Sequence, residues 1–239
     1  MTLAAVQGPV ESRTDRLAEL LGQTSPGARS RQALADVLPV LEPLRPLLPH
    51  GGLARGTVTV APDLGTLLAL AAGPADADPY GYTAVIGLPE LGLAAAAGYG
   101  IDLRRLLAVD DPGAHYAEVV STLAAVCPVV IAAGHRNLAP RAADRLAAHL
   151  RRAGTVVLTP GPWPGAQLRV DTRSEGWVGV GDGWGQLDRR RVELRVVGRG
   201  SAGRERRAEL WLPDANGEVS VPTETAAAVP TGTPTVASA

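Results

Sequence analysis

The segment VAPDLGTLLAL, residues 60–70, lies where a short apolar run gives way to a leucine-rich stretch. The apolar run predicts a buried strand, and the leucine-rich stretch predicts a helix. Between them, Pro62, Asp63 and Gly65 predict a turn. A strand, a tight loop and a helix in this order are typical of a phosphate-binding loop. The segment therefore predicts the α/β architecture in which such loops occur.

The loop departs from the phosphate-binding pattern G-x-x-x-x-G-K-[ST] at the positions that carry its chemistry. Ala61 stands in place of the first glycine, Thr66 stands in place of the lysine, and Leu67 falls on the position of the metal-binding hydroxyl. Asp63 adds a negative charge where a helix N-terminus would otherwise attract a phosphate. We therefore interpret the loop as a degenerate nucleotide site. Its residues are Ala61, Pro62, Asp63, Gly65 and Thr66.

A second part of a nucleotide site is also missing. Nucleotide hydrolysis uses an acidic residue at the end of a buried strand to hold Mg²⁺. The strand expected at residues 127–134, CPVVIAAG, ends without an acid. With both parts absent, we expect no ATP hydrolysis, no cofactor and no catalytic residues.

The rest of the central region alternates between apolar runs and helical patterns. Strands are expected at residues 56–61, 82–87, 106–111, 127–134 and 155–161. Helices are expected at residues 64–73, 90–98, 114–126 and 139–154. Unbroken apolar strands are buried on both faces, as in parallel sheets covered by helices. The pattern predicts an α/β fold with a mainly parallel sheet.

After Pro164 the pattern changes to alternating apolar and polar residues. The segments AQLRVDT, GWVGVGDG, VELRVVG and RAELWLP have this period of two, and no helical pattern separates them. They predict antiparallel strands joined in hairpins, with one buried face and one solvent-exposed face. GVGDGWG, residues 179–185, is interpreted as a hairpin turn.

The two ends of the chain have different patterns. Residues 12–22 predict a short helix, and residues 31–42 predict a second helix that later prolines interrupt. Residues 223–239 carry no charge after Glu224 and predict a disordered tail. The expected domains are an N-terminal helical arm (1–50), a core (51–222) that is β-rich from about residue 165, and the tail (223–239).

The composition excludes several functions. The chain of 239 residues has no lysine, so neither a Schiff base nor a phosphate-loop lysine is available. Cys127 is the single cysteine, and the four histidines lack ligand spacing, so we expect no internal disulfide and no metal site. No membrane span and no secretory signal are expected, which favours a cytoplasmic protein.

The positive charge gathers in one part of the chain. Residues 151–210 carry 12 arginines and 7 acids, a net charge of +5, whereas residues 1–150 and 211–239 are each at −3. The arginines either contact DNA phosphates or an acidic partner, or simply solvate a sheet face. The contact candidates are Arg189, Arg190, Arg191, Arg195, Arg206 and Arg207.

Tryptophans provide a further contact candidate. Trp163 lies among glycines and prolines, so we expect it on a loop where a partner could reach it. Trp177 and Trp211 lie in predicted strands, and core packing is the favoured interpretation for both.

Several segments together resemble a known family. GGLARGTVTVAPDLGTLLALAA (51–72) resembles the segment of RecA recombinases that leads through their phosphate loop. TAVIGLPELGLAAAAGYGIDLRRLLAV (83–109) resembles the stretch that follows it. With GPWPGAQLRV, GWVGVGDGWGQLDRRRVEL and RRAELWLPD, the chain from about residue 50 to 213 most resembles the ImuA family, in its actinobacterial ImuA-prime form.

The resemblance implies a RecA-like fold and an accessory role in SOS-induced, error-prone translesion DNA synthesis. Its implied partners are an ImuB-like, catalytically inactive Y-family polymerase relative and, through it, an error-prone DNA polymerase. RecA and DNA are further candidate partners. Two alternatives remain open at this point. One is an atypical DNA-stimulated RecA-type ATPase in which Arg136 or another arginine replaces the lysine, and the other is a SulA-like cell-division inhibitor.

Overall fold

The computed structural model describes residues 36–77, 81–134, 140–181, 184–199 and 203–222. The chain divides into two units, Met1–Val37 and Leu38–Ala239, and the fold below is that of the second. The expected helix at 12–22 and the expected tail at 223–239 lie outside the described residues. Across the part of the chain that is described, no helix is long and apolar enough to cross a membrane.

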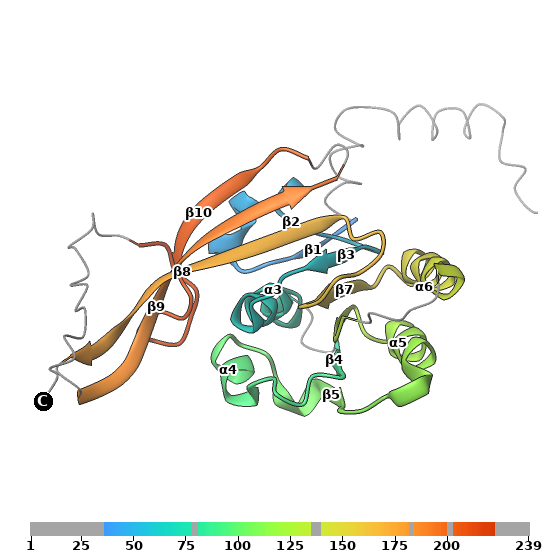
Figure 1. The fold of residues 1–239 in the computed structure, drawn as a ribbon, viewed down its shortest axis with the longest axis horizontal. Coiled ribbons are helices and arrows are strands. Elements are labelled where there is room, and N and C mark those ends of the chain that lie inside the picture. Colours follow the sequence, from blue (N-terminus) through green and yellow to red (C-terminus); the bar gives the residue numbers. More distant parts are fainter. Residues whose placement is uncertain (1–35, 78–80, 135–139, 182–183, 200–202, 223–239) are drawn as a thin grey trace, which may run out of the picture. The chain divides into compact units, whose positions relative to one another are not determined.

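An eight-stranded sheet forms the centre of the fold, in the order β10-β9-β8-β3-β7-β6-β4-β5 (Figure 1). The parallel strands are β3 (Val58–Val60), β4 (Thr83–Ile86), β5 (Leu106–Val109), β6 (Val129–Ala132) and β7 (Val156–Thr159). Three longer strands complete the sheet: β8 (Leu168–Gly181), β9 (Trp184–Gly198) and β10 (Arg206–Trp211). Because β8 pairs parallel with β3 while β9 and β10 run antiparallel, the α/β prediction with an antiparallel extension is confirmed.

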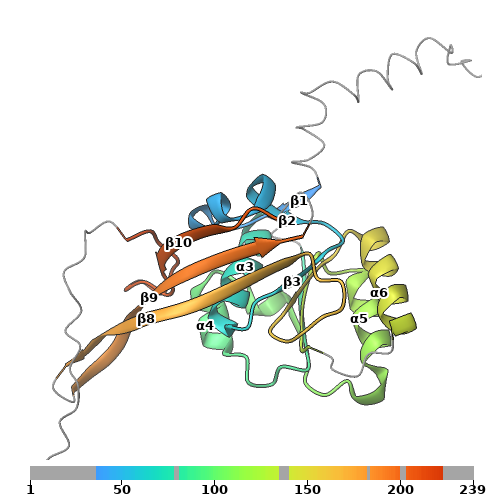
Figure 2. The ribbon, with the colours of Figure 1, turned by 45° about the horizontal axis from the view of Figure 1, so that its top comes forward.

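Helices cover both faces of the parallel strands (Figure 2). On one face lie α3 (Leu64–Ala77) and α4 (Leu93–Gly98); on the other lie α5 (Tyr116–Ala124) and α6 (Pro140–Ala153). Along β6, Ile131 faces the first pair of helices and Val130 faces the second. Successive side chains of a strand point to opposite faces, so an unbroken apolar run fills two cores at once.

The position of β3 decides where a site can form. This first parallel strand lies inside the sheet, between β7 and β8, and the chain continues from its carboxyl end into α3. Later strands are added on both sides of it. In open α/β sheets, ligands bind beyond the carboxyl end of the strand at which the direction of winding reverses. The loop after β3, residues 61–63, occupies that place.

The segment before β3 differs from the prediction. The helix expected at 31–42 is wrong for residues 36–42, which form strand β1 (Val37–Pro39) and the start of the 3₁₀ helix η1 (Glu42–Leu47). A second 3₁₀ helix, η2 (Pro49–Gly51), precedes β2 (Gly52–Ala54), and β1 pairs with β2. The closely spaced prolines explain the difference, because each removes a backbone donor that an α-helix needs.

The antiparallel strands are also longer than expected. Residues 168–172 of AQLRVDT and residues 176–181 of GWVGVGDG belong to one strand, β8, which pairs with β9 along its whole length. The pairing shifts register between Ser174 and Gly176, and again between Val178 and Val180. At these irregular positions the sequence pattern had suggested a break between two strands. Such bulges place an extra residue on one strand without ending the ladder. Of the turn expected at 179–185, residues 179–181 belong to β8 and residues 184–185 to β9, with Gly181 paired to Trp184, and residues 182–183 lie outside the described residues.

The remaining elements connect the parallel strands. The 3₁₀ helix η3 (Leu103–Arg105) leads into β5, and η4 (Gly113–His115) leads into α5. The helix expected at 90–98 begins later, at Leu93.

Candidate functional site

The carboxylate of Asp63 caps the first turn of α3. Its Oδ1 accepts hydrogen bonds from the backbone N–H of Thr66, at 2.8 Å, and from the Thr66 hydroxyl, at 2.9 Å. The first N–H groups of a helix have no partner within the helix, and aspartate is among the side chains that best satisfy them. A carboxylate of this chain therefore occupies the end of α3 at which a working phosphate loop binds an anion.

Arg190 reaches this carboxylate from β9, 127 residues away along the chain. Its Nη1 lies 2.8 Å from the second carboxylate oxygen of Asp63, and the two side chains are only 16% and 21% exposed. The Arg190 Nε also donates to the Ser174 hydroxyl on β8, at 3.2 Å. The ion pair thus joins the loop after β3 to the β8–β9 hairpin.

Other polar groups pack around this pair. The Thr66 hydroxyl lies 2.7 Å from the hydroxyl of Thr172 on β8. A Cβ atom added at Gly65 would lie 3.3 Å from Asp63 Oδ1 and 3.5 Å from the Tyr99 hydroxyl. Burial, followed by the negative charge of Asp63, raises the pKa of Tyr99 to about 12. Tyr99 is therefore neutral at physiological pH.

The other loop residues have structural roles. Ala61 is fully buried, and its N–H donates to the carbonyl of Thr159 at 2.8 Å, which extends the pairing of β3 with β7. Pro62 is exposed. The sequence correctly located the loop, but it did not reveal Arg190, Ser174, Thr172 or Tyr99 as its neighbours. The even spacing of Thr172 and Ser174 on one face of β8 was the available signal.

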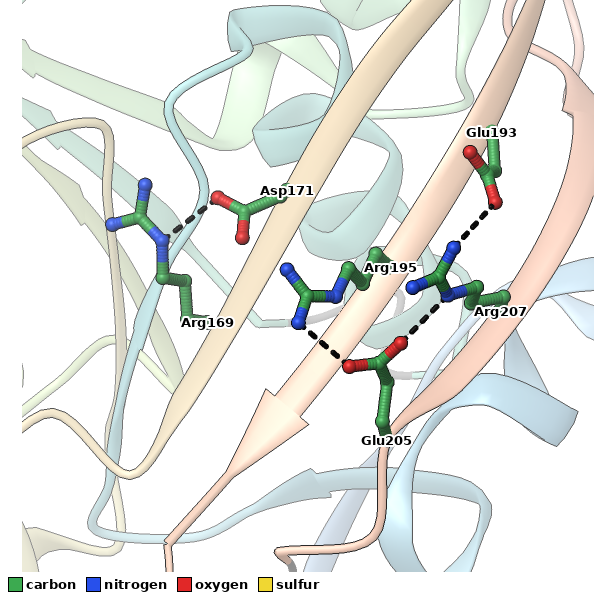
Figure 3. A network of polar contacts seen from close by, with 6 residues as sticks. All are labelled: Arg169, Asp171, Glu193, Arg195, Glu205 and Arg207. Atoms are coloured by element: carbon green, nitrogen blue, oxygen red, sulfur yellow. Dashed lines mark hydrogen bonds and ion pairs between the residues drawn. The ribbon is translucent and has the colours of Figure 1, made fainter.

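Arg195 on β9 and Arg207 on β10 pair with nearby acids of the antiparallel region (Figure 3). Arg195 and Arg207 both bind Glu205, at 2.7 and 2.6 Å, and Arg207 also lies 3.4 Å from Glu193. These hydrogen bonds lower the pKa of Glu205 to about 2. Glu205 is therefore ionised at neutral pH and offsets part of the positive charge. A similar pair, Arg169 with Asp171, lies on β8.

The remaining arginine candidates do not converge on one point. Arg191 pairs with Glu175 and Glu209, and the Arg189 guanidinium stacks 4.6 Å from the ring centre of Trp211. In β9 the odd-numbered arginines lie on the face opposite the buried side chains Val192 and Leu194, whereas Arg190 shares their face. The structure therefore brings only Arg190 to the loop after β3. Arg206 lies at the start of β10.

Trp163 lies on the loop after β7, as expected, but it is buried, and the expectation of core packing is wrong for Trp177. Trp163 is only 7% exposed, and its ring packs beside that of Tyr116 from α5, with 6.4 Å between the ring centres. Trp177 is 42% exposed, and the Arg190 guanidinium lies 6.0 Å from its ring centre. The loop after β7 folds back onto the helix layer, which neighbouring glycines and prolines alone do not predict. Of these two tryptophans, the one on the β8–β9 hairpin is therefore the exposed one.

Within the described ranges, no three His, Cys, Asp or Glu side chains lie together in a way that could hold a metal ion. Cys127 is buried, and burial raises the pKa of its thiol, which disfavours the reactive thiolate.

The match to a known protein family covers the parallel strands of the sheet. Residues 46–165 match the MT3502 N-terminal domain family. The uncharacterized protein Rv3395c of Mycobacterium tuberculosis (strain ATCC 25618 / H37Rv) is 35% identical over 99 residues, which are 41% of this chain and 48% of that protein. The chain thus matches about half the length of this curated relative. The family match includes the Asp63 loop and ends before β8, which precedes the strand that carries Arg190. Because it spans half of the sequence, the chain belongs to the MT3502 N-terminal domain family.

Proposed function

We propose that this chain is a non-catalytic, RecA-like accessory protein of an error-prone translesion synthesis complex. It binds an ImuB-like, inactive Y-family polymerase relative and, through it, an error-prone DNA polymerase. The ImuA resemblance of residues 50–213 motivates this role. The observation that supports a non-catalytic role is the Asp63–Arg190 ion pair at the start of α3.

The pair uses the groups that a nucleotide would need. Phosphate binding at a helix N-terminus depends on free N–H donors and a nearby cation. Here the Thr66 N–H is bound to the Asp63 carboxylate, and the Arg190 guanidinium faces that same carboxylate. A phosphate approaching this point would meet a negative charge of the protein itself. The geometry therefore favours a retained scaffold over a nucleotide site.

The end of β6 supports the same interpretation. A Cβ added at Gly134, just beyond this strand, would lie 2.5 Å from the Cα of Gly161, which follows β7. Backbone from two loops thus meets at the edge where a nucleotide-hydrolysing protein holds its Mg²⁺ through an acidic side chain. An acidic residue at Gly134 would require these loops to separate.

Titration with MgATP is expected to show no binding at sub-millimolar concentrations. The Asp63 carboxylate repels the phosphates, and no lysine is present to compensate. Isothermal titration calorimetry on the full chain checks this result, with a RecA recombinase as the positive control. Binding at micromolar concentration, or phosphate release stimulated by single-stranded DNA, would contradict the non-catalytic proposal and favour the ATPase.

Co-expression with the ImuB-like protein of the same organism is expected to give one joint species. Size-exclusion chromatography with light scattering measures its mass directly. Since β8 pairs with β3 inside the sheet, deleting the C-terminal part would remove strands of the core, so point variants are the suitable probes. Two separate peaks at tens of micromolar would remove the main support for an adaptor.

A further inference from the structure

The arginines of α6 differ from those of the antiparallel strands. Arg191, Arg195 and Arg207 are each bound to acids of the same sheet. In the described part of the chain, by contrast, no ion pair involves the arginines of α6. These are Arg141, Arg145, Arg151 and Arg152. Four arginines without an ion pair are therefore grouped on this one helix, whereas the sequence alone pointed to β9 and β10. Among the described residues, Arg173, Arg189 and Arg206 of the antiparallel strands also lack an ion pair, but they are spread over three strands.

Two of these arginines border a groove between α5 and α6, which pack side by side (Figure 2). The groove has a volume of about 450 Å³. Its apolar lining consists of Ala117, Ala142, Leu146 and Ala148. Arg145 and Arg152 also line it, and both are exposed. They are seven positions apart, about 10 Å along the helix axis.

The remaining lining contains one acidic residue against the two arginines. Glu118 is the acidic residue of the groove, and its carboxylate already lies 3.3 Å from Nδ1 of His115. His149 also lines the groove, and its Nε2 is shielded from solvent without a hydrogen-bond partner. Buried polar atoms are normally satisfied. A ligand with an acidic group would pair with the two exposed arginines.

We propose that this groove binds a short acidic segment of a partner protein. An apolar side chain of the segment lies on the alanine-rich floor, and flanking carboxylates pair with Arg145 and Arg152. Arginine clusters recognise acidic motifs in this way, and apolar grooves between helices receive apolar anchors. The proposal deepens the adaptor function, and it rests on that function for the presence of a protein partner.

A protein segment fits this groove better than DNA. A phosphodiester backbone would contact the arginines but would leave the alanine and leucine surface without an apolar partner. Proteins that bind duplex DNA usually neutralise several phosphates with basic side chains, whereas two arginines line this groove. DNA binding that depends on Arg145 and Arg152, without any effect on the protein complex, would overturn the assignment.

Charge reversal provides the first test. The double variant R145E/R152E is expected to weaken binding of the ImuB-like protein by about tenfold or more, because both carboxylate contacts become repulsive. R141E/R151E is the matched control, since it makes the same charge change on the same helix at positions that do not line the groove. Binding is measured by surface plasmon resonance, and circular dichroism verifies folding of each variant. Equal losses in both double variants would overturn the proposal in favour of general electrostatic attraction.

Filling the groove provides the second test. Ser121 lines it from α5, so S121W is expected to weaken binding while leaving every charge in place. Retained affinity in a folded S121W protein would overturn the proposal. Binding of a fluorescein-labelled single-stranded DNA to the same variants, measured by fluorescence anisotropy, tests the alternative that the groove binds DNA.

The outcome separates this proposal from the adaptor function. If the wild-type chain does not bind the ImuB-like protein, the adaptor function fails, and the groove is then tested with the peptide Glu-Glu-Leu-Glu-Glu. Amide chemical shifts that change on α5 and α6 alone, and are lost in R145E/R152E, support the groove. Absence of shifts at millimolar peptide overturns it. If the wild type binds and the groove variants bind equally well, only the groove proposal fails.

Discussion

Replacing Gly73 with alanine is expected to lower the free energy of unfolding by about 2 kcal/mol or more, because the added methyl group has no room. In an exposed helix interior the same change is expected to stabilise by about 1 kcal/mol, so the sign of the effect is informative. In α3, a Cβ at this position would lie 2.3 Å from the Cα of Val40 and 2.7 Å from the backbone nitrogen of Leu41. Backbone atoms cannot rotate away as a flexible side chain can. The helix and the segment before η1 must therefore move apart.

Urea unfolding followed by circular dichroism measures this effect. Gly98→Ala in α4 is the matched control, because the nearest atom to its added Cβ is the Gly217 carbonyl oxygen at an ordinary 3.7 Å. We expect this control to unfold near the wild-type midpoint. Wild-type or higher stability of G73A would show that α3 does not pack against Val40 as described.

Replacing Asp63 with alanine is expected to cost about 2–3 kcal/mol of stability, combining a lost helix cap with a broken, mostly buried ion pair. The cap accounts for the hydrogen bonds to Thr66, and the ion pair accounts for the contact with Arg190. In the variant, the Arg190 side chain, which is only 16% exposed in the wild type, would lose its carboxylate partner. An uncompensated cation in such a position is costly.

Two further variants divide this cost. Asp63→Asn retains an oxygen that can accept from the Thr66 N–H, so we expect a loss between that of D63A and zero. The double variant D63A/R190A is expected to be less destabilised than the sum of the two single variants, by about 1 kcal/mol or more. Urea unfolding curves of all four proteins give this coupling directly. Additive losses would show that Asp63 and Arg190 do not form a pair in solution.

The alternation of strands and helices could be predicted from the sequence because it depends on short-range patterns of apolar residues. The strands β4, β6 and β7 lie within their expected ranges, since each is a continuous apolar run that must be buried on both faces. The helix α6 was equally clear, from its periodic leucines and its end at Gly154. The long β8 was not readable, because glycines that signal a turn can also mark a bulge when a partner strand continues beside them.

The sequence by itself determined the fold class and the absence of the phosphate-loop lysine at residues 61–66. Both depend on residue type and local spacing, which the chain carries without reference to its fold. Only the tertiary structure decided what surrounds the loop, because Asp63 and Arg190 meet across 127 residues through the pairing of β9 with β8 and β8 with β3. The same holds for the surface charge. Which arginines are neutralised and which remain available depends on strand register and helix packing, and neither is written in the local sequence.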